Sequence, residues 1–562
     1  MPVRHRPGPS DGTMSKPNRT NGNERNKTKS KSSQQAANPV KRSTPRANTK
    51  LAASEKRGAE NVAATARMKV TIPVRSVTPQ SVVAHLGPTN SGKTYDALRF
   101  LADRGQGVYA APLRQLAHEA YDKLVSLVGA SQVGLRTGEE SINASAPILC
   151  VTPECAPMSG DTLVLDEVHW VRDLERGWAW TKLLAGGNYD HIRLCGARET
   201  EDLIKVVFPD AKIFLHARLA PLDVTALVAA TTVPQNWLVV AFSRKAVLAI
   251  VGELQRAGRS AGALYGALPP VARREQIRRF EAAEIDVLVC TDVVGHGVNL
   301  PCAGVALAEE TKFDGADRRA LELWEGAQIV GRAGRGPGAK GLCSAYSTPM
   351  LDQVSAAWLT EVAQAASGTT QTGLEVEYGT ILPSLGDLGS ERDVKTRNLD
   401  RLLRLWSTKA EAGLCDHQWI RVGPVDAMVE RHKVLTELAP YCDVVSAWAF
   451  ITVPVDFNSV ALHAAALVLS GNSKRMRALL GASLGNQEEC EETGRIARDV
   501  RALAHQLPQC REFLEAAEDL EQRSGSRILE MLAEQHTQRF GVCSSCKGPC
   551  RPWVPTCPRC KS

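Results

Sequence analysis

The eight residues from Gly87 to Thr94 constrain this chain more than any other stretch. They read GPTNSGKT and fit the pattern G-x-x-x-x-G-K-[ST] at every fixed position. The apolar run at 81–86 before them predicts a buried strand, and the residues from Tyr95 onward predict a helix. A loop between strand and helix turns backbone N–H groups toward one point, where the helix N-terminus adds positive charge. A glycine-rich turn without a ligand is the alternative, which this strand and helix disfavour.

This loop predicts a site for a nucleoside triphosphate with Mg²⁺. Lys93 should reach the β- and γ-phosphates, and the hydroxyl of Thr94 should hold the Mg²⁺ ion. Glycines at 87 and 92 leave room where a side chain would collide with the ligand. The candidate ATP-binding residues of the loop are Gly87, Pro88, Thr89, Asn90, Ser91, Gly92, Lys93 and Thr94.

A second motif lies downstream, where the apolar run at 163–165 ends in Asp166 and Glu167. We expect Asp166 to bind Mg²⁺ through a water molecule. Glu167 should orient the water that attacks the γ-phosphate and help to deprotonate it. An acidic pair after an apolar run is usually only a strand end, but the phosphate loop ahead of it favours the catalytic interpretation.

Strands and helices alternate over two successive stretches, which predicts parallel sheets covered by helices on both faces. A chain of 562 residues is too long for one core. We therefore expect an ATP-binding domain at 69–218 and a second domain at 219–349. A helical accessory domain should follow at 350–538, where Leu399, Leu402, Leu403 and Trp406 form one apolar stripe.

The second domain has no phosphate loop of its own, so it should act as a lid on the first. Its segment 328–335, QIVGRAGR, places two arginines three residues apart near one face of a helix start. From across a cleft, Arg332 and Arg335 could stabilise charge on the phosphoryl group being transferred, with Gln328 beside them. An arginine pair on a solvated face is the alternative.

Taken in order, these motifs resemble the superfamily-two DExH-type helicases, in particular the mitochondrial degradosome RNA helicase family and its bacterial relatives. The resemblance is carried by GPTNSGKTYDAL, YAAPLRQLAHEAYDKL, LDEVHWVRDLERGWAW, TDVVGHGVNL and QIVGRAGR, and it is dense from about 81 to 348. It implies an α/β fold with two tandem RecA-like domains and ATP-driven unwinding of RNA, with DNA also possible, in the 3′ to 5′ direction. It also implies an exoribonuclease partner. Contacts to the strand would come from Pro112, Arg114, Thr137, Gly138, Thr152, Ser243 and Thr291.

Two residues depart from the family pattern. His169 stands at the fourth place of the Asp-Glu box, where the family usually has Gln, and it should still couple the ATP site to the domain interface. His296 replaces the usual Met. The basic arm and the Cys-rich tail are also unexpected in that family, and they weaken the expectation of an exoribonuclease.

The N-terminal arm carries the basic character of the chain. Residues 1–67 hold 15 Lys and Arg against 4 Asp and Glu, whereas the whole chain has a net charge of +7. Poor in aromatic residues, residues 1–68 are expected to be disordered and to contact phosphates or only to solvate. The arm also resembles a transit peptide but shows no amphipathic stripe over 1–50, so we expect a cytoplasmic location, with a mitochondrial one as the alternative. No apolar run is long enough to span a membrane.

The tail at 539–562 predicts a zinc ribbon. Two C-x-x-C pairs separated by ten residues supply four thiolates, which is the set that structural Zn²⁺ prefers. Cys550 lies off this pattern but could replace one ligand, and a disulfide pairing is disfavoured in a reducing compartment. Nearby cations and Trp553 suit a nucleic-acid strand, while docking of a protein is the competing use. The candidate ligands are Cys543, Cys546, Cys557 and Cys560.

Two classes of function follow from these motifs. The first is a nucleic-acid-dependent ATPase that unwinds or translocates, and the complete set of ATP-site residues favours it. The second is a nucleic-acid clamp or scaffold that uses ATP only as a conformational switch.

Overall fold

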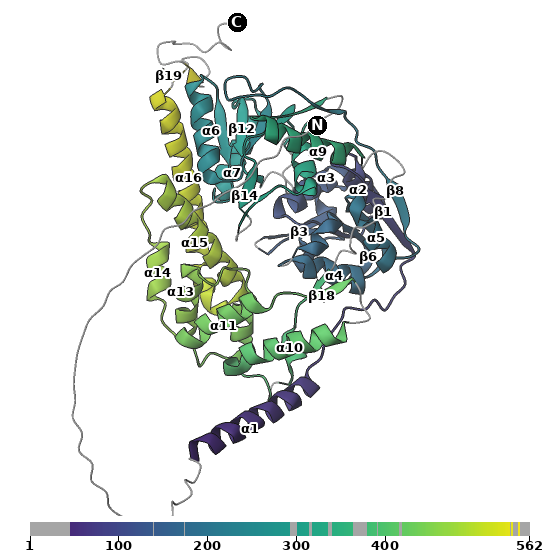
Figure 1. Cartoon of the computed structure of the whole chain (residues 1–562), viewed down its shortest axis with the longest axis vertical. Helices are drawn as coiled ribbons and strands as arrows, with labels where there is room; N and C mark the ends of the chain where they lie inside the picture. The colour runs from purple at the N-terminus through teal and green to yellow at the C-terminus, as the bar shows by residue number, and fades with distance from the viewer. Residues whose placement is uncertain are drawn as a thin grey trace, which may run out of the picture. The chain divides into compact units, whose positions relative to one another are not determined.

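The structure is a computed structural model. It describes residues 45–542 and 549–550, apart from 139, 174, 293–299, 314–316, 335–339, 364–378, 391, 415–418 and 540. Contacts within the chain define two units, 1–59 and 60–562. All the sheets lie in the second unit (Figure 1).

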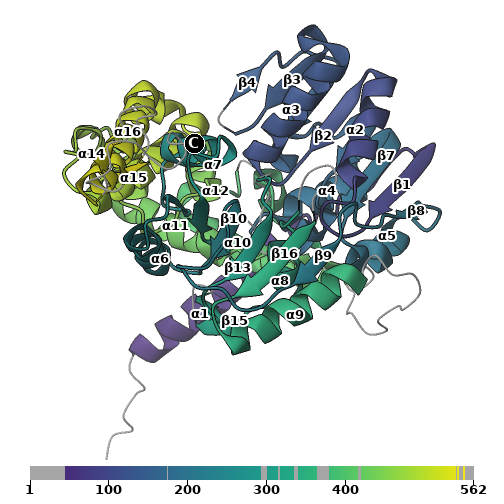
Figure 2. The same ribbon diagram turned by 90° about the horizontal axis from the view of Figure 1, so that it is seen from above.

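The first sheet carries the phosphate loop. Its order is β4-β3-β5-β2-β6-β7-β1-β8, and every neighbouring pair is parallel except β3 with β4. Figure 2 shows β4, β3 and β2 on one side of this sheet and β1 and β8 on the other. The strands are β1 (Ser81–Leu86), β2 (Gly107–Ala110), β3 (Val133–Arg136), β4 (Ser141–Ile142), β5 (Ile148–Val151), β6 (Ser159–Leu165), β7 (Asn188–Gly196) and β8 (Lys212–Leu215).

Helices cover this sheet because parallel strands need crossover connections. They are α2 (Lys93–Arg104), α3 (Arg114–Val128), α4 (Gly177–Gly186) and α5 (Glu201–Val207). The predicted strand at 81–86 coincides with β1, where Ala84 and Leu86 are buried and Val82 and Val83 are half-buried. At the edge of the sheet, Phe214 and Leu215 of β8 are exposed. The helix expected from Tyr95 begins two residues earlier, at Lys93, so the phosphate-loop lysine itself opens α2.

The second sheet is parallel throughout, in the order β11-β12-β10-β13-β16-β9. Its strands are β9 (Leu222–Val224), β10 (Trp237–Val240), β11 (Ala261–Leu264), β12 (Val287–Cys290), β13 (Gly304–Leu307) and β16 (Gly341–Ala345). Its helices are α6 (Arg244–Arg256), α7 (Pro270–Glu281), α8 (Leu323–Val330) and α9 (Thr348–Ala363). The short pair β14 (Thr311–Phe313) and β15 (Arg318–Ala320) lies between β13 and α8 in the chain.

The two sheets confirm the α/β class with two RecA-like domains in tandem. In each sheet the loops that carry the motifs follow the carboxyl ends of parallel strands. Ligands bind at that edge in folds of this kind. The domain boundaries themselves stay predictions.

The third region is mostly helical, as expected. Its elements are β17 (Gly379–Ile381), α10 (Leu399–Gly413), β18 (Ile420–Val422), α11 (Asp426–Leu438), α12 (Val444–Thr452), α13 (Val460–Leu469), α14 (Lys474–Leu480), α15 (Gln487–Gln506) and α16 (Leu514–Arg539). The stripe of Leu399, Leu402, Leu403 and Trp406 is at most 1% exposed, so it is core as predicted.

This helical region packs against both sheets. Its α10 residues share one apolar core with the first sheet, and the backbone N–H of Thr380 donates to the hydroxyl of Thr181 in α4 at 2.8 Å. The long helix α16 runs beside α15 and contacts α6 and α7 of the second domain (Figure 1). A single chain segment therefore touches both RecA-like domains.

One expectation at the N-terminus was wrong. Residues 45–67, placed in the disordered arm, form helix α1 (Pro45–Arg67). In its last turns, the carbonyl of Thr65 accepts a hydrogen bond from the ammonium of Lys409 in α10 at 2.7 Å, and Asn61 accepts one from Arg401 at 3.0 Å. These contacts hold the end of the helix to α10, although most of its described side chains stay exposed. Residues 1–44 lie outside the described part of the chain.

Among the helices that the structure describes, none is long and apolar enough to cross a membrane. At the C-terminus, β19 (Gly541–Val542) pairs antiparallel with β20 (Pro549–Cys550). The four predicted zinc ligands lie outside the described residues.

Candidate active site

The phosphate loop joins β1 to α2 and is shaped by its two glycines. A Cβ atom at Gly87 would lie 2.4 Å from the carbonyl oxygen of His216, so only glycine fits there. Gly92 has a φ of +83°, a left-handed conformation that glycine adopts without strain. Lys93 is 9% exposed, and its ammonium donates to the carbonyl of Pro88 at 3.1 Å. Among the described residues, the buried hydroxyl of Ser91 has no hydrogen-bond partner. The loop thus offers a cation and an unused hydroxyl beside the start of a helix.

Asp166 lies at the carboxyl end of β6 and is 3% exposed. Its carboxylate accepts hydrogen bonds from the hydroxyl of Tyr109 at 2.7 Å and from the backbone N–H of Glu167 at 2.9 Å. The hydroxyl of Thr94 lies 3.3 Å from the same carboxylate. Burial, with the neighbouring charge of Glu167, raises the pKa of Asp166 above its usual range. The Thr94 hydroxyl and the Asp166 carboxylate are hard oxygen ligands that fit a Mg²⁺ ion. A bound Mg²⁺ would favour the ionised form of Asp166, as the charge of Lys93 already does.

Glu167 links the acidic pair to the second domain. Its φ of 49° and ψ of 56° are left-handed, a conformation that non-glycine residues rarely adopt and that is found at functional sites. The turn directs the chain into a 3₁₀ helix, Val168–Arg172, that carries His169. The Nδ1 atom of His169 lies 3.4 Å from the Glu167 carboxylate, and its Nε2 atom lies 3.0 Å from the amide nitrogen of Gln328 in α8. His169 therefore lies between the Asp-Glu box and α8, and its coupling of the ATP site to the domain interface stays a prediction.

Arg332 lies two residues after the end of α8 and is 5% exposed, so it does not belong to a solvated face. Its backbone is fixed by the thiol of Cys302, which donates to the Arg332 carbonyl at 3.3 Å. Gln328 lies four residues before Arg332, and its contact with His169 brings this part of the second domain to the Asp-Glu box. Arg335 lies outside the described residues.

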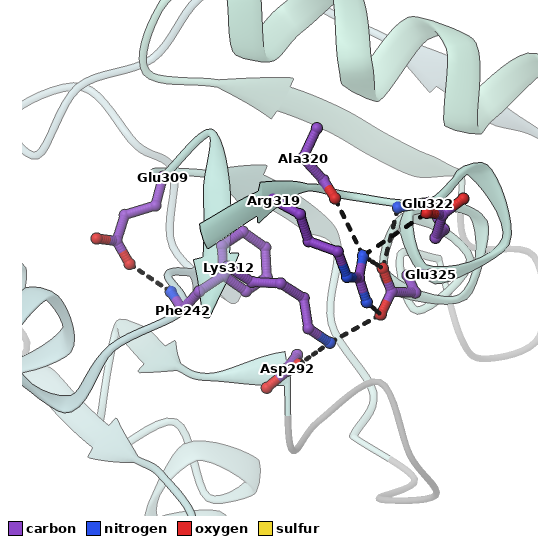
Figure 3. Close-up of polar contacts among 8 residues, drawn as sticks. All are labelled: Phe242, Asp292, Glu309, Lys312, Arg319, Ala320, Glu322 and Glu325. Atoms are coloured by element: carbon purple, nitrogen blue, oxygen red, sulfur yellow. Dashed lines mark hydrogen bonds and ion pairs between the residues drawn. The ribbon is translucent and has the colours of Figure 1, made fainter. Parts of the chain in front are cut away.

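A polar network holds α8 to two strand ends of the second domain (Figure 3). Glu325 of α8 accepts hydrogen bonds from Arg319 of β15 at 2.7 and 2.9 Å and from Lys312 of β14 at 2.8 Å. Lys312 also donates to Asp292, next to Thr291, at 2.9 Å. Burial alone would raise the pKa of Glu325, but these hydrogen bonds hold it at about 2. The ion network therefore fixes α8 relative to the end of β12.

A second contact of this kind lies at β10. The backbone N–H of Phe242, next to Ser243, donates to the carboxylate of Glu309 at 2.5 Å (Figure 3). The segment from 309 to 325 thus touches the ends of β10 and β12 as well as α8. Both strand ends carry a residue predicted to contact nucleic acid.

The predicted nucleic-acid residues fall on adjacent strands. Pro112, Thr137 and Thr152 follow β2, β3 and β5, which are neighbours in the first sheet. Ser243 and Thr291 follow β10 and β12, which are neighbours in the second. Arg114 is the exposed first residue of α3, and Gly138 is exposed beside Thr137. Thr137 and Thr152 are buried, with 8% and 6% exposure, so they can offer only edges to a ligand.

Comparison with known proteins agrees with this geometry. Residues 72–213 match the DEXQ-box helicase domain of Suv3, and residues 223–337 match the helicase conserved C-terminal domain. The paired domains are a Suv3-type superfamily-two helicase core. The fourth residue of the box departs from that type, because His169 stands where the name of the domain has Gln.

The Suv3-type core has named relatives. The chain is 36% identical over 275 residues to the mitochondrial DExH-box ATP-dependent RNA helicase DExH16 of Arabidopsis thaliana, covering 47% of this chain and 48% of the relative. It is 34% identical over 270 residues to the mitochondrial ATP-dependent RNA helicase SUV3 of Saccharomyces cerevisiae, covering 45% and 36%. The chain therefore spans about half the length of these curated relatives or less.

Among solved structures, S. cerevisiae Dbp5 bound to RNA and ADP BeF3 is similar at a TM-score of 0.40 and 16% identity. That likeness covers 50% of this chain and 83% of the Dbp5 chain.

Sequence reasoning missed two residues of the Suv3-type core. Tyr109 in β2 is one; a buried tyrosine hydroxyl usually needs a partner, which was the available signal, and the structure shows that the partner is Asp166. Arg218 lies at the predicted boundary between the domains and contacts both of them. Nothing local in the sequence distinguished it from other arginines.

Proposed function

We propose that this chain is an ATP-dependent RNA helicase that couples ATP hydrolysis to strand separation. The observation that carries the proposal is the contact of His169 with Gln328 at 3.0 Å, because it joins the Asp-Glu box of the first domain to α8 of the second. A protein that only binds ATP needs a phosphate loop. A protein that moves along a strand also needs contacts through which its ATP site acts on the second domain.

The residues divide the chemistry among them. The phosphate loop, with Lys93, would hold the triphosphate, while Thr94 and Asp166 would hold Mg²⁺, which neutralises phosphate charge when bound. Glu167 would take the proton of the attacking water, and His169 would orient that carboxylate. Arg332, with Arg335, would stabilise negative charge on the group being transferred. Gln328 would contact His169 when the two domains close, so that closure affects the position of His169.

The single strand would cross the carboxyl ends of β2, β3 and β5 and then those of β10 and β12. Two of the predicted contacts lie at helix starts, with Arg114 at α3 and Ser243 at α6. The Ser243 hydroxyl accepts from the backbone N–H of Ala246 at 3.1 Å, which leaves its proton for a phosphate oxygen. Helix starts favour phosphate groups. Unwinding in the 3′ to 5′ direction and an exoribonuclease partner belong to the proposal through the family resemblance alone.

The tail would bind one Zn²⁺ through Cys543, Cys546, Cys557 and Cys560. Pairing of β19 with β20 supports this, since those two strands flank the first cysteine pair in the sequence. The named relatives are mitochondrial, which favours the mitochondrial alternative over the cytoplasmic location that we first expected.

Strand displacement on a duplex with a single-stranded overhang tests the proposal. We expect ATP-dependent displacement of RNA by the wild type. Glu167→Gln should retain ATP binding and lose at least about 100-fold in kcat, as expected for a lost general base. ATP binding without displacement of RNA or DNA would support the clamp that uses ATP as a switch. Near-normal turnover of Glu167→Gln would remove Glu167 from its role.

A further inference from the structure

Arg218 lies in the connection between β8, the last strand of the first sheet, and β9 of the second. Its guanidinium is partly buried and contacts three separate segments. It donates to the carbonyl and the hydroxyl of Thr89 at 3.1 and 3.0 Å, and to the carbonyl of Ala220 at 3.0 Å. It also donates to the carbonyl of Gly331 at 2.9 Å and to that of Ala333. One side chain thus joins the phosphate loop, the interdomain connection and the residues after α8.

On the side of the phosphate loop, the connection holds two successive carbonyl groups. Arg218 binds the carbonyl of Thr89, and the backbone N–H of Leu219 donates to that of Asn90 at 2.9 Å. In a trans peptide the C=O and the following N–H point in opposite directions. The N–H groups of Asn90 and Ser91 are therefore turned away from the connection. These contacts help to keep Asn90 at a φ of +54°, which a non-glycine residue rarely adopts.

On the side of the second domain, the two carbonyls that Arg218 binds belong to the residues directly before and after Arg332. The amide of Asn90 adds a hydrogen bond to the carbonyl of Gly334 at 3.1 Å. The backbone around Arg332 is thus fixed relative to the phosphate loop. A planar guanidinium with five N–H donors can serve such a spread of acceptors, whereas an ammonium group presents a compact charge.

We propose that Arg218 is a positioning residue for ATP hydrolysis. It fixes the position of Arg332 relative to the phosphate loop, so that a displacement of Thr89 also displaces Arg332. This rests on the proposed ATPase function of the same site. Arg218 acts through the backbone of other residues, so it should affect the transition state more than ground-state binding of ATP.

The test is steady-state ATP hydrolysis by four full-length proteins: wild type, Arg218→Met, Arg332→Ala and the double variant. We expect Arg218→Met to lower kcat by at least about tenfold, the order of one hydrogen bond to a charged group. The KM for ATP should change by less than about threefold. The kcat of the double variant should lie within about twofold of that of Arg332→Ala, because the effects of residues that act as one unit are not additive.

Two further proteins make the test specific. Arg218→Lys keeps the positive charge but loses the planar guanidinium, so its kcat should be as low as that of Arg218→Met. It also replaces Arg218→Met in the test if that variant does not fold. Arg431→Met is the matched control, since Arg431 also donates to two carbonyls, those of Val455 at 2.7 Å and Ile451 at 3.1 Å, within the helical region. Its kcat should stay near that of the wild type.

Several outcomes would overturn the inference while leaving the ATPase function intact. They are a wild-type kcat in Arg218→Met, full rescue by lysine, or losses that multiply in the double variant. A wild type that does not hydrolyse ATP would instead contradict the proposed function.

Discussion

Tyr109→Phe removes a single hydroxyl group from the edge of the proposed Mg²⁺ site. That hydroxyl donates to the buried carboxylate of Asp166 at 2.7 Å, and the tyrosine itself is 1% exposed. Phenylalanine fills the same space, so packing in β2 should be kept. What changes is the stabilisation of the ionised form of Asp166.

The size of the effect follows from the bond that is lost. A hydrogen bond to a charged group is worth about 1.5 to 3 kcal/mol, or about ten- to 150-fold in an equilibrium constant. Asp166 would keep the hydrogen bond from the backbone N–H of Glu167 at 2.9 Å and the longer one from the Thr94 hydroxyl at 3.3 Å. Groups that orient a metal ligand typically contribute 10- to 100-fold to metal affinity, which is roughly the same range. We therefore expect the affinity for Mg²⁺ to fall by about ten- to 100-fold.

The measurement is the concentration of free Mg²⁺ that gives half-maximal binding of a fluorescent ATP analogue, followed by the same titration with hydrolysis as the readout. In Tyr109→Phe both midpoints should rise. The kcat at saturating Mg²⁺ should stay within about threefold of the wild type, since the hydroxyl does not reach the reacting atoms.

Tyr265→Phe is the control. Tyr265 of the second domain is also 1% exposed and also donates to a buried carboxylate, that of Glu491 at 2.6 Å. This variant should lose stability without any change in the Mg²⁺ midpoint. If Tyr109→Phe bound Mg²⁺ like the wild type, Asp166 would not be the carboxylate on which the metal depends. Equal shifts in the two variants would mean a general loss of stability.

Three further predictions concern other parts of the chain. The pKa of Glu325 in the folded state is about 2, below its value in the unfolded state. Its ionised form therefore contributes about 3 kcal/mol to the free energy of unfolding above pH ~4.5, and this contribution is lost as pH falls toward 2. Urea denaturation should show Glu325→Gln to be less stable than the wild type at pH 7, and the difference in stability should narrow below pH ~4.5. Deleting residues 1–44 should lower the slope of log K against log salt by about 0.7 for each lost phosphate contact to a single strand, and an unchanged slope would make the arm a solvating or targeting segment. The wild type should carry one Zn²⁺ with Zn–S distances of about 2.3 Å and Cys557→Ser should lose it; zinc loss with unchanged strand affinity would make the tail a protein-docking site.

The geometry of the candidate ATP site was predictable because its sequence signals are local. A phosphate loop needs glycine at fixed places and a lysine at the helix start, and Gly87, Gly92 and Lys93 meet those needs within seven residues. The Asp166–Glu167 pair is likewise readable, since a strand ends there in the sequence and in the structure. Strand and helix alternation gave the two sheets for the same reason: hydrophobic periodicity is a property of neighbouring residues.

Helix α1 shows where this reasoning fails. Composition predicted disorder through residue 68, and the segment 45–67 has too little apolar surface to fold alone. Its last turns are instead held by Arg401 and Lys409 of α10, residues more than 300 positions away. Contacts supplied by a distant helix cannot be predicted from the sequence of the segment that they stabilise.

The coupling between the domains is harder still to predict, because its residues carry no motif of their own. Within the second domain, the ion network of Lys312, Arg319 and Glu325 that holds α8 is equally hard to predict, because each is an ordinary surface residue in the sequence. Between the domains, the hydrogen bonds of Arg218 described above go to the Thr89 hydroxyl and to backbone carbonyl groups, and a carbonyl is available at any residue type. The acceptors therefore leave no trace in the sequence, and only the arrangement of the two sheets brings them together. Reactive groups can be read from residue types, whereas the parts that transmit movement between them depend on tertiary structure.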